Sequence, residues 1–65
     1  MKSNLTRREE EVIAVLIQGK SNEEIGENLH VSINTVRTHL SSCYKKMKVK
    51  NRTELVVKYI SIKSN

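Results

Sequence analysis

The sequence predicts an all-α fold, a compact four-helix domain. Three observations support this: the chain length, the residues suited to start helices and the spacing of apolar residues. The chain has 65 residues, close to the smallest size that folds alone, so residues 1–65 are expected to form one domain with a core over about residues 5–62. Residues suited to helix N-caps precede four segments with helical apolar spacing: Thr6, Ser21, Ser32 and Asn51. The expected helices therefore span about residues 7–18, 22–28, 33–47 and 52–62.

Three of the four expected helix starts carry a capping pattern. A Glu stands three residues after Thr6, Ser21 and Asn51, and in the first two cases the cap and the Glu can bond reciprocally to each other's backbone amides. The first of these acids, Glu9, is expected either to serve only as this cap or to pair with a basic residue of the third or fourth helix. The first helix is expected to stop before Gly19, which suits a left-handed helix end.

The second expected helix is short and is joined to the third by a turn of three residues, Leu29 to Val31. Two helices joined by so short a turn meet at a large angle. Gly26 lies inside the second helix, where glycine costs roughly 1 kcal/mol relative to alanine. We interpret it as a point where the backbone of another helix comes close, because a residue without a side chain permits the shortest distance.

The third expected helix has two chemically different faces. At about 3.6 residues per turn, its apolar residues fall within one arc of roughly 100°, and six hydrogen-bond donors fall within another arc of similar width. The apolar arc contains Ile33, Val36, Leu40, Cys43, Tyr44 and Met47. The donor arc contains Asn34, Arg37, Thr38, Ser41, Lys45 and Lys48, and none of these is acidic. A face that is merely solvated normally carries some acids, so this segregation favours a functional face.

The net charge of the chain indicates a polyanionic partner. Lys and Arg number 12 against 7 Asp and Glu, which gives a formal net charge of +5 and a pI of about 9.7. A domain pI above about 9 is typical of nucleic-acid binding. Most of the acids lie before residue 25, whereas basic residues concentrate in the middle of the chain. The positive charge is therefore expected on one segment.

The sequence lacks the residue patterns of several other protein classes. The single cysteine, Cys43, cannot form an internal disulfide, and too few thiols are present for a structural zinc site, which favours a reducing, cytoplasmic compartment. No apolar run approaches the roughly 18 residues of a membrane span. Paired catalytic carboxylates, a nucleophile elbow, a Gly-rich phosphate loop and metal-ligand spacing are missing as well. We therefore expect no enzyme activity, no catalytic residue, no cofactor, no metal and no membrane partner.

A short helix, a tight turn and a longer helix with a basic donor face match the helix-turn-helix arrangement, whose second helix enters the major groove of double-stranded DNA. In this helix Arg37 suits guanine, Thr38 suits a thymine methyl group or a base edge, and Ser41 suits either kind of base. Asn34 is a weaker candidate for a base contact. The expected phosphate contacts come from helix starts and basic side chains: Ser21, Asn22, Ser32, Thr35, Lys45, Lys46, Lys48, Lys50 and Arg52.

The fourth expected helix is apolar around more than half of its circumference. Three of its residues are spaced to dock on the core: Leu55, Tyr59 and Ile62. Its remaining apolar residues are Val56, Val57 and Ile60. A terminal helix cannot bury all of this surface against three short neighbours, so self-association or docking on another domain is expected to cover the remainder.

These residues resemble the LuxR/GerE-type domains of bacterial transcription regulators, from Leu5 to about Tyr59. The blocks that carry the resemblance are Leu5-Thr6, Arg8-Glu9, Glu11-Val12, Gly19-Lys20-Ser21-Asn22, Glu24-Ile25, Ser32, Thr35-Val36-Arg37, His39-Leu40, Lys46-Met47, Val49 and Asn51-Arg52. The resemblance implies a DNA-binding domain that forms a homodimer through its fourth helix, here at Val56, Val57 and Ile60. It also implies base contacts from Arg37, Thr38 and Ser41. The chain departs from the family pattern at Gly26, where alanine is usual, and at Lys48, where glycine is commonest.

Regulators of this type usually carry a receiver or ligand-binding domain before the DNA-binding domain. The resemblance therefore implies a stand-alone regulator or an excised C-terminal domain, with a separate regulatory domain or the transcription machinery as further partners. It also implies work in the bacterial cytoplasm, on the nucleoid when DNA is bound. An alternative function is a protein-interaction module that acts through the apolar fourth helix. RNA binding is less favoured, because it normally uses exposed aromatic residues and the chain has only two tyrosines.

Overall fold

The computed structural model describes residues 4–64, and within that range it contains four α-helices and no β-strand. The helices are α1 (Arg7–Leu16), α2 (Asn22–Leu29), α3 (Ile33–Met47) and α4 (Arg52–Ser64). The predicted all-α class is confirmed, and α3 has the predicted bounds. α1 ends earlier than predicted, because the amides of Gln18 and Gly19 bond to carbonyls three residues back and tighten the last turn. α2 and α4 run slightly further than predicted.

The predicted caps begin the helices. At α1, Thr6 Oγ1 accepts from the Glu9 amide (3.1 Å), and the Glu9 carboxylate accepts from the Thr6 amide (2.9 Å). At α4, Asn51 Oδ1 accepts from the Glu54 amide (2.9 Å), but the Glu54 carboxylate accepts from the amide of Lys50, one residue before the cap (2.8 Å). These bonds satisfy amides that have no partner within the helix.

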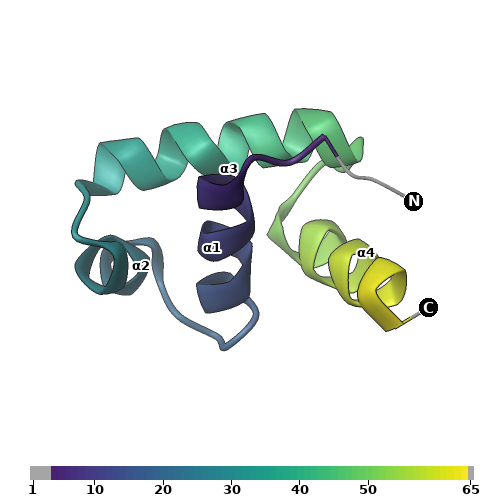
Figure 1. Ribbon diagram of the computed structural model, residues 1–65, viewed down its shortest axis with the longest axis horizontal. Helices are drawn as coiled ribbons and strands as arrows, with labels where there is room; N and C mark the ends of the chain where they lie inside the picture. The colour runs from purple at the N-terminus through teal and green to yellow at the C-terminus, as the bar shows by residue number, and fades with distance from the viewer. Residues whose placement is uncertain (1–3, 65) are drawn as a thin grey trace.

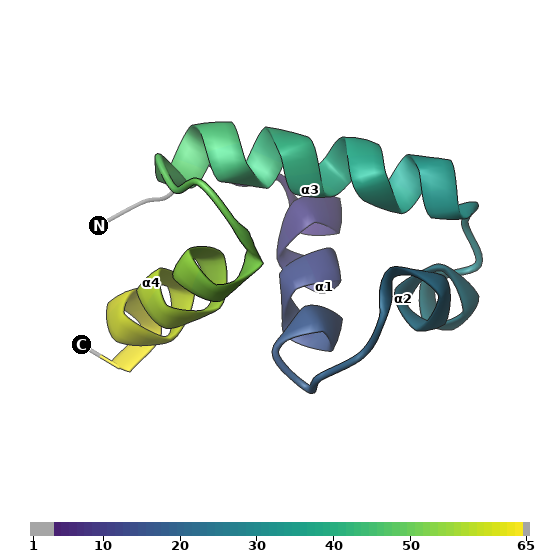
Figure 2. The ribbon, with the colours of Figure 1, turned by 180° about the vertical axis from the view of Figure 1, so that it is seen from behind.

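α3 lies along one side of the molecule, and the other three helices pack against the same side of it (Figure 1). α2 lies near the start of α3, α1 crosses its middle and α4 lies near its end, and the view from behind shows the same order (Figure 2). The buried apolar residues between the helices are Val12, Ile13, Leu16, Ile25, Val36, Leu40, Cys43, Met47, Leu55 and Tyr59. Among the helices described, none combines the length and the hydropathy needed to span a bilayer.

Ile62 is exposed, so the prediction that it docks on the core is wrong. α4 buries Leu55 and Tyr59 against its neighbours, and its last turn extends beyond the core. The apolar surface of α4 therefore continues further toward the C-terminus than the sequence predicts.

On α3, two residues that the sequence placed on the core side, Ile33 and Tyr44, are half-buried.

Gly26 permits a close approach, although the predicted partner is wrong. A methyl group on its Cα would lie 2.7 Å from the Val31 carbonyl oxygen and 3.6 Å from Val36 Cγ2. The nearest backbone is therefore that of the turn after α2, and not that of another helix. The turn folds back because His30 adopts a left-handed conformation (φ 60°) and the Val31 amide bonds to the Gly26 carbonyl at 2.9 Å.

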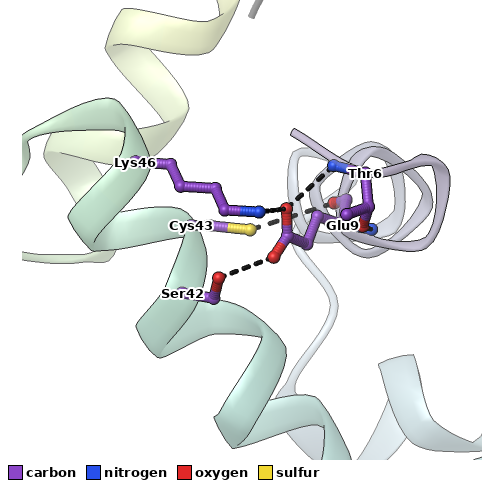
Figure 3. Close-up of polar contacts among 5 residues, drawn as sticks. All are labelled: Thr6, Glu9, Ser42, Cys43 and Lys46. Carbon is purple, nitrogen blue, oxygen red and sulfur yellow. Dashed lines mark hydrogen bonds and ion pairs between the residues drawn. The ribbon is translucent and has the colours of Figure 1, made fainter. Parts of the chain in front are cut away.

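Glu9 is a buried charged residue that joins α1 to α3 (Figure 3). The residue is only 4% exposed, and its carboxylate accepts hydrogen bonds from Ser42 Oγ (2.6 Å) and Lys46 Nζ (2.9 Å) on α3. Burial raises the pKa of a carboxyl group, but these donors and the Thr6 amide outweigh burial and lower the pKa of Glu9 to about 2. Glu9 thus makes both the predicted cap and a pair with a basic residue of the third helix.

Cys43 is buried beside the Glu9 contacts, and its Sγ lies 4.0 Å from the Glu9 carbonyl oxygen (Figure 3). Burial, with a contribution from the negative charge of Glu9, raises the pKa of the thiol to about 11. The thiol therefore stays protonated at neutral pH and packs as a small apolar side chain. Within residues 4–64, no group of three or more His, Cys, Asp or Glu side chains is placed to hold a metal ion.

We predict that Glu9 makes the domain less stable in acid. Between pH 4.5, the ordinary carboxyl pKa, and about pH 2, the unfolded chain binds a proton at Glu9 that the folded domain does not bind. The free energy of unfolding therefore falls as the pH is lowered through this window, by an amount on the order of 3 kcal/mol. Denaturant unfolding of the wild type and of Glu9→Gln from pH 2 to pH 6 measures this loss.

Glu11→Gln is the control for this experiment, because Glu11 is an exposed carboxylate of the same helix that pairs with Arg8. It is expected to change the free energy of unfolding by less than about 1 kcal/mol at pH 7. The Glu9→Gln variant is expected to be less stable at pH 7 and to lose less stability in acid than the wild type. Equal acid slopes for Glu9→Gln and the wild type would contradict the role given to Glu9.

We predict that Lys48→Gly stabilises the domain. Lys48 ends α3 in a left-handed conformation (φ 59°, ψ 47°), which glycine adopts without the steric cost of a Cβ atom. The free energy of unfolding should rise by about 0.5 to 1 kcal/mol, measured by denaturant unfolding at pH 7. Lys48→Ala is the matched control, because it removes the same charge but keeps Cβ. If both variants changed stability equally, the backbone conformation would not be the cause.

Candidate nucleic-acid interface

The outer side of α3 carries a row of hydrogen-bond donors. Five of these residues lie on α3 and Lys48 follows as its C-cap; the six residues, which we call the donor face, are all exposed: Asn34, Arg37, Thr38, Ser41, Lys45 and Lys48. α3 contains no Asp or Glu, so this face has no carboxylate of its own. Among the described residues, α1, α2 and α4 all pack on one side of α3 (Figure 2), and the residues of the donor face are exposed to solvent.

Two contacts within α3 order the start of the donor face. Thr38 Oγ1 donates to the Asn34 carbonyl at 3.0 Å, which uses its hydroxyl proton and leaves its methyl group and an oxygen lone pair for a partner. Arg37 Nη1 lies 3.5 Å from Asn34 Oδ1, at the limit of a hydrogen bond, so most guanidinium donors remain available. The Thr38 bond uses only the backbone carbonyl of Asn34, and the long contact to Arg37 involves only its side-chain oxygen.

Serine caps form the starts of α2 and α3. Ser32 Oγ accepts from the Thr35 amide (3.1 Å) and lies 2.9 Å from Thr35 Oγ1. Ser21 Oγ accepts from the Glu24 amide (3.2 Å), and the Glu24 carboxylate accepts from the Ser21 amide (2.8 Å). The serine hydroxyl groups are thus bound within the protein, and the positive ends of both helices lie at these caps.

A shallow hollow of about 650 Å³ brings the starts of α2, α3 and α4 together. The residues around it include Ser21, Asn22, Glu23, Glu24, Arg37 and Arg52. Within the hollow, Arg52 Nη1 donates to Asn22 Oδ1 at 2.8 Å, and Arg52 Nη2 donates to the backbone carbonyl of Lys20. Residues that the sequence predicted separately as base or phosphate contacts therefore meet at one place on the surface.

The predicted basic contacts divide into two groups. Lys45, Lys48 and Lys50 are exposed; Lys46 is exposed as well but, like Arg52, is bound to another part of the protein. Lys46 turns toward α1, where its Nζ lies 2.9 Å from the Glu9 carboxylate (Figure 3), and Arg52 binds Asn22. The sequence offered a basic partner on the third or fourth helix for Glu9 without naming Lys46, and it did not reveal the partner of Arg52, which lies 30 residues away along the chain.

α4 exposes apolar residues beyond its contact with the core. Val57 is 62% exposed and Ile60 is 47% exposed, whereas Val56 is half-buried and packs against the core. A shallow groove of about 580 Å³ borders this strip, with Val57 and Ile62 among its lining residues. Of the three residues predicted for a dimer contact, two are thus on the surface, and Ile62, which the sequence assigned to the core, is exposed as well.

The family of this chain is known. The family described as "Bacterial regulatory proteins, luxR family" matches residues 3–59. The chain is 43% identical over 54 residues to the transcriptional regulatory protein LiaR of Bacillus subtilis (strain 168), and 52% identical over 52 residues to the CsgBAC operon transcriptional regulatory protein of Escherichia coli (strain K12). These matches cover 83% and 80% of this chain, but 26% and 24% of the two relatives. The chain thus spans about a quarter of their length.

Solved structures share the fold of the chain. The structure of transcription factor GerE aligns with a TM-score of 0.85 at 31% identity, over 94% of this chain and 91% of that chain. The crystal structure of the response regulator ChrA, from a heme-sensing two-component system, aligns with a TM-score of 0.89 at 35% identity, over 97% of this chain and 31% of that chain. The chain therefore belongs to the luxR family of bacterial regulatory proteins, as a helix-turn-helix DNA-binding domain of transcription regulators.

Proposed function

We propose that the domain regulates transcription by binding double-stranded DNA sequence-specifically, with α3 in the major groove. The donor face carries this proposal, because its six residues are exposed and include no carboxylate, and five of them lie on a helix whose other side is buried. The major groove of B-DNA admits an α-helix, and helix-turn-helix domains insert their second helix there. The net charge of +5 adds attraction to the phosphates.

The base contacts in this proposal come from the first half of α3. Arg37 donates to N7 and O6 of a guanine, which requires a guanidinium with unused donors. Thr38 contacts a thymine methyl group, because its hydroxyl proton is used by the Asn34 carbonyl. Ser41 bonds a base edge directly or through water, and Asn34 is proposed as a weaker base contact.

The phosphate contacts in this proposal lie on both sides of the donor face. Lys45, Lys48 and Lys50 are exposed cations that neutralise phosphates directly. The starts of α2 and α3, at Ser21 and Asn22 and at Ser32 and Thr35, bring the positive ends of their helix dipoles to further phosphates, although the amides of Ser21 and Thr35 are themselves bound within the caps. Two other predicted contacts, Lys46 and Arg52, act at longer range, because their side chains bind Glu9 and Asn22.

We also propose that the domain binds an operator of two half-sites as a homodimer through α4. The exposed apolar strip of Val57 and Ile60, with Val56 beneath it, is the surface that a second copy would cover. A symmetric dimer would present two donor faces to successive major grooves on one side of the DNA. The same strip favours the second candidate function, a protein-interaction module, whose partner would occupy α4 without DNA.

The input that controls DNA binding is proposed to come from outside this domain. The matched relatives are about four times longer than the matched segment, and their printed names describe whole regulators. We propose a separate regulatory domain or the transcription machinery as the further partner, with no cofactor in the domain itself. Because its partner is DNA, the domain is proposed to work in the bacterial cytoplasm, associated with the nucleoid when bound.

Titration with duplex DNA at two salt concentrations tests the main proposal. Sites are first selected from a pool of random duplexes, and the selected duplex is compared with a scrambled duplex of equal length. The selected duplex is expected to bind at least about a thousandfold more tightly than the scrambled duplex, and binding to both should weaken as salt rises. Equal affinity for both duplexes would remove sequence specificity, and no binding at low salt would remove the DNA proposal.

We predict that Arg37→Ala weakens binding to the selected site by about 1 to 3 kcal/mol and relaxes the preference at one base pair. Affinities for the site and its single-base variants measure both effects. Lys45→Ala is the matched control, because it should weaken binding to all duplexes similarly and reduce the salt slope by about 1. If Arg37→Ala weakened all duplexes equally, Arg37 would be a phosphate contact.

We predict that Val57→Glu weakens binding to a duplex with two half-sites and leaves binding to a single half-site within about threefold, because a charge in the apolar strip opposes dimer packing. Ile17→Glu is the control, since it places the same charge at an exposed apolar residue of the α1–α2 connection. Val56 is not a suitable site for this test, because it packs against the core. Unchanged affinity of Val57→Glu for both duplexes would exclude a dimer contact at Val57.

A further inference from the structure

The contact between Arg52 and Asn22 has a consequence for the chemistry of the Asn22 side chain. A guanidinium is a donor only, so the atom of the Asn22 amide that faces it must be the oxygen, as observed at 2.8 Å. The amide nitrogen with its two N–H donors lies on the opposite side of the planar group. Arg52 thus determines which end of the Asn22 amide is left for another partner.

The guanidinium of Arg52 is itself held in place at two points. Its Nη1 binds Asn22 Oδ1, and its Nη2 binds the Lys20 carbonyl in the connection before α2. All three residues are half-buried, which limits competition from water for these bonds. A lysine cannot reproduce this pair of bonds, because its ammonium is a point charge without the planar fork of donors.

The surroundings of Asn22 favour an anion as the partner of its N–H donors. Asn22 is the first residue of α2, at the positive end of the helix dipole, and it lines the hollow together with Arg37 of the donor face. Two acids, Glu23 and Glu24, also line the hollow, but three cations line it with them: Lys20, Arg37 and Arg52. A DNA phosphate beside Arg37 would therefore meet N–H groups at Asn22.

We propose that Arg52 is a positioning residue for DNA binding, which turns the Asn22 amide so that its N–H donors meet a DNA phosphate oxygen. This inference rests on the proposed function of the domain. It assigns different roles to two residues that the charge and capping patterns grouped together: Asn22 contacts the phosphate, and Arg52 acts through Asn22. It also links the start of α4 to the start of α2, since Arg52 is the first residue of α4.

Asn22→Asp tests the proposal without removing the contact to Arg52. An aspartate keeps an oxygen toward the guanidinium, so the folded domain should remain as stable as the wild type or become more stable. Its second oxygen replaces the N–H donors and repels a phosphate, so affinity for the selected duplex should fall by about tenfold or more. Asn28→Asp is the matched control, because it adds the same charge at an exposed position of α2 and should change affinity by less than about threefold.

A double-mutant cycle separates positioning from direct contact. Arg52→Met and Asn22→Ala should each weaken binding by about tenfold, and the double variant should bind no more weakly than Arg52→Met. Replacing single phosphates by neutral methylphosphonates should reveal one phosphate whose neutralisation weakens the wild type but not Arg52→Met or Asn22→Ala. If a variant were only less stable, neutralising that phosphate would still weaken its binding, so this measurement separates positioning from instability.

Additive losses in the double variant, or wild-type affinity in Asn22→Asp, would overturn the proposal. A direct phosphate contact by Arg52 would also overturn the proposal. It would appear as a decrease of about 0.9 in the salt slope of Arg52→Met, while neutralising the phosphate assigned to Asn22 still weakened binding of this variant. If the wild type binds no duplex, the proposed function fails instead. In that case the side-chain amide signals of Asn22 in nuclear magnetic resonance spectra still test the contact: they should shift in Arg52→Met and not in Lys50→Met.

Discussion

The buried side of α3 is the contact on which the rest of the domain depends. Its apolar residues Val36, Leu40, Cys43 and Met47 pack into the core, and α1, α2 and α4 each contact this helix. A chain of 65 residues has room for one core, so a helix that touches all three others has its opposite side left for solvent. The packing that stabilises the fold therefore also creates the exposed donor face.

Polar contacts add direction to this packing. Burial of apolar surface has no preferred orientation, whereas hydrogen bonds restrict both distance and angle. Glu9 joins the start of α1 to Ser42 and Lys46 in the second half of α3, and Arg52 joins the start of α4 to Asn22 at the start of α2. These contacts join two different pairs of helices, so together they restrict how the helices rotate against one another.

The features that the sequence predicted correctly are local ones. N-cap side chains bond to amides three residues away, so Thr6, Ser21 and Ser32 mark helix starts, and the two faces of α3 follow from helical geometry. Features that depend on contacts between distant segments could not be read from spacing. The partner of Arg52 is such a case, and for Glu9 the sequence predicted a basic partner but did not single out Lys46, because charge alone grouped Lys46 and Arg52 with the phosphate contacts. The place of Ile62 depends on where α4 leaves the core, which no pattern within α4 reveals.

The central claim is that the donor face of α3 and the start of α2 form the surface that binds DNA. Mapping backbone amide shifts by nuclear magnetic resonance during titration with a selected duplex tests this claim most directly, because every helix is observed at once. The account predicts the largest shifts over Ile33 to Lys45 and Ser21 to Glu24, with small shifts over Glu10 to Ala14 on α1. Shifts confined to Val57 to Ile62 on α4, with none on α3, would contradict it.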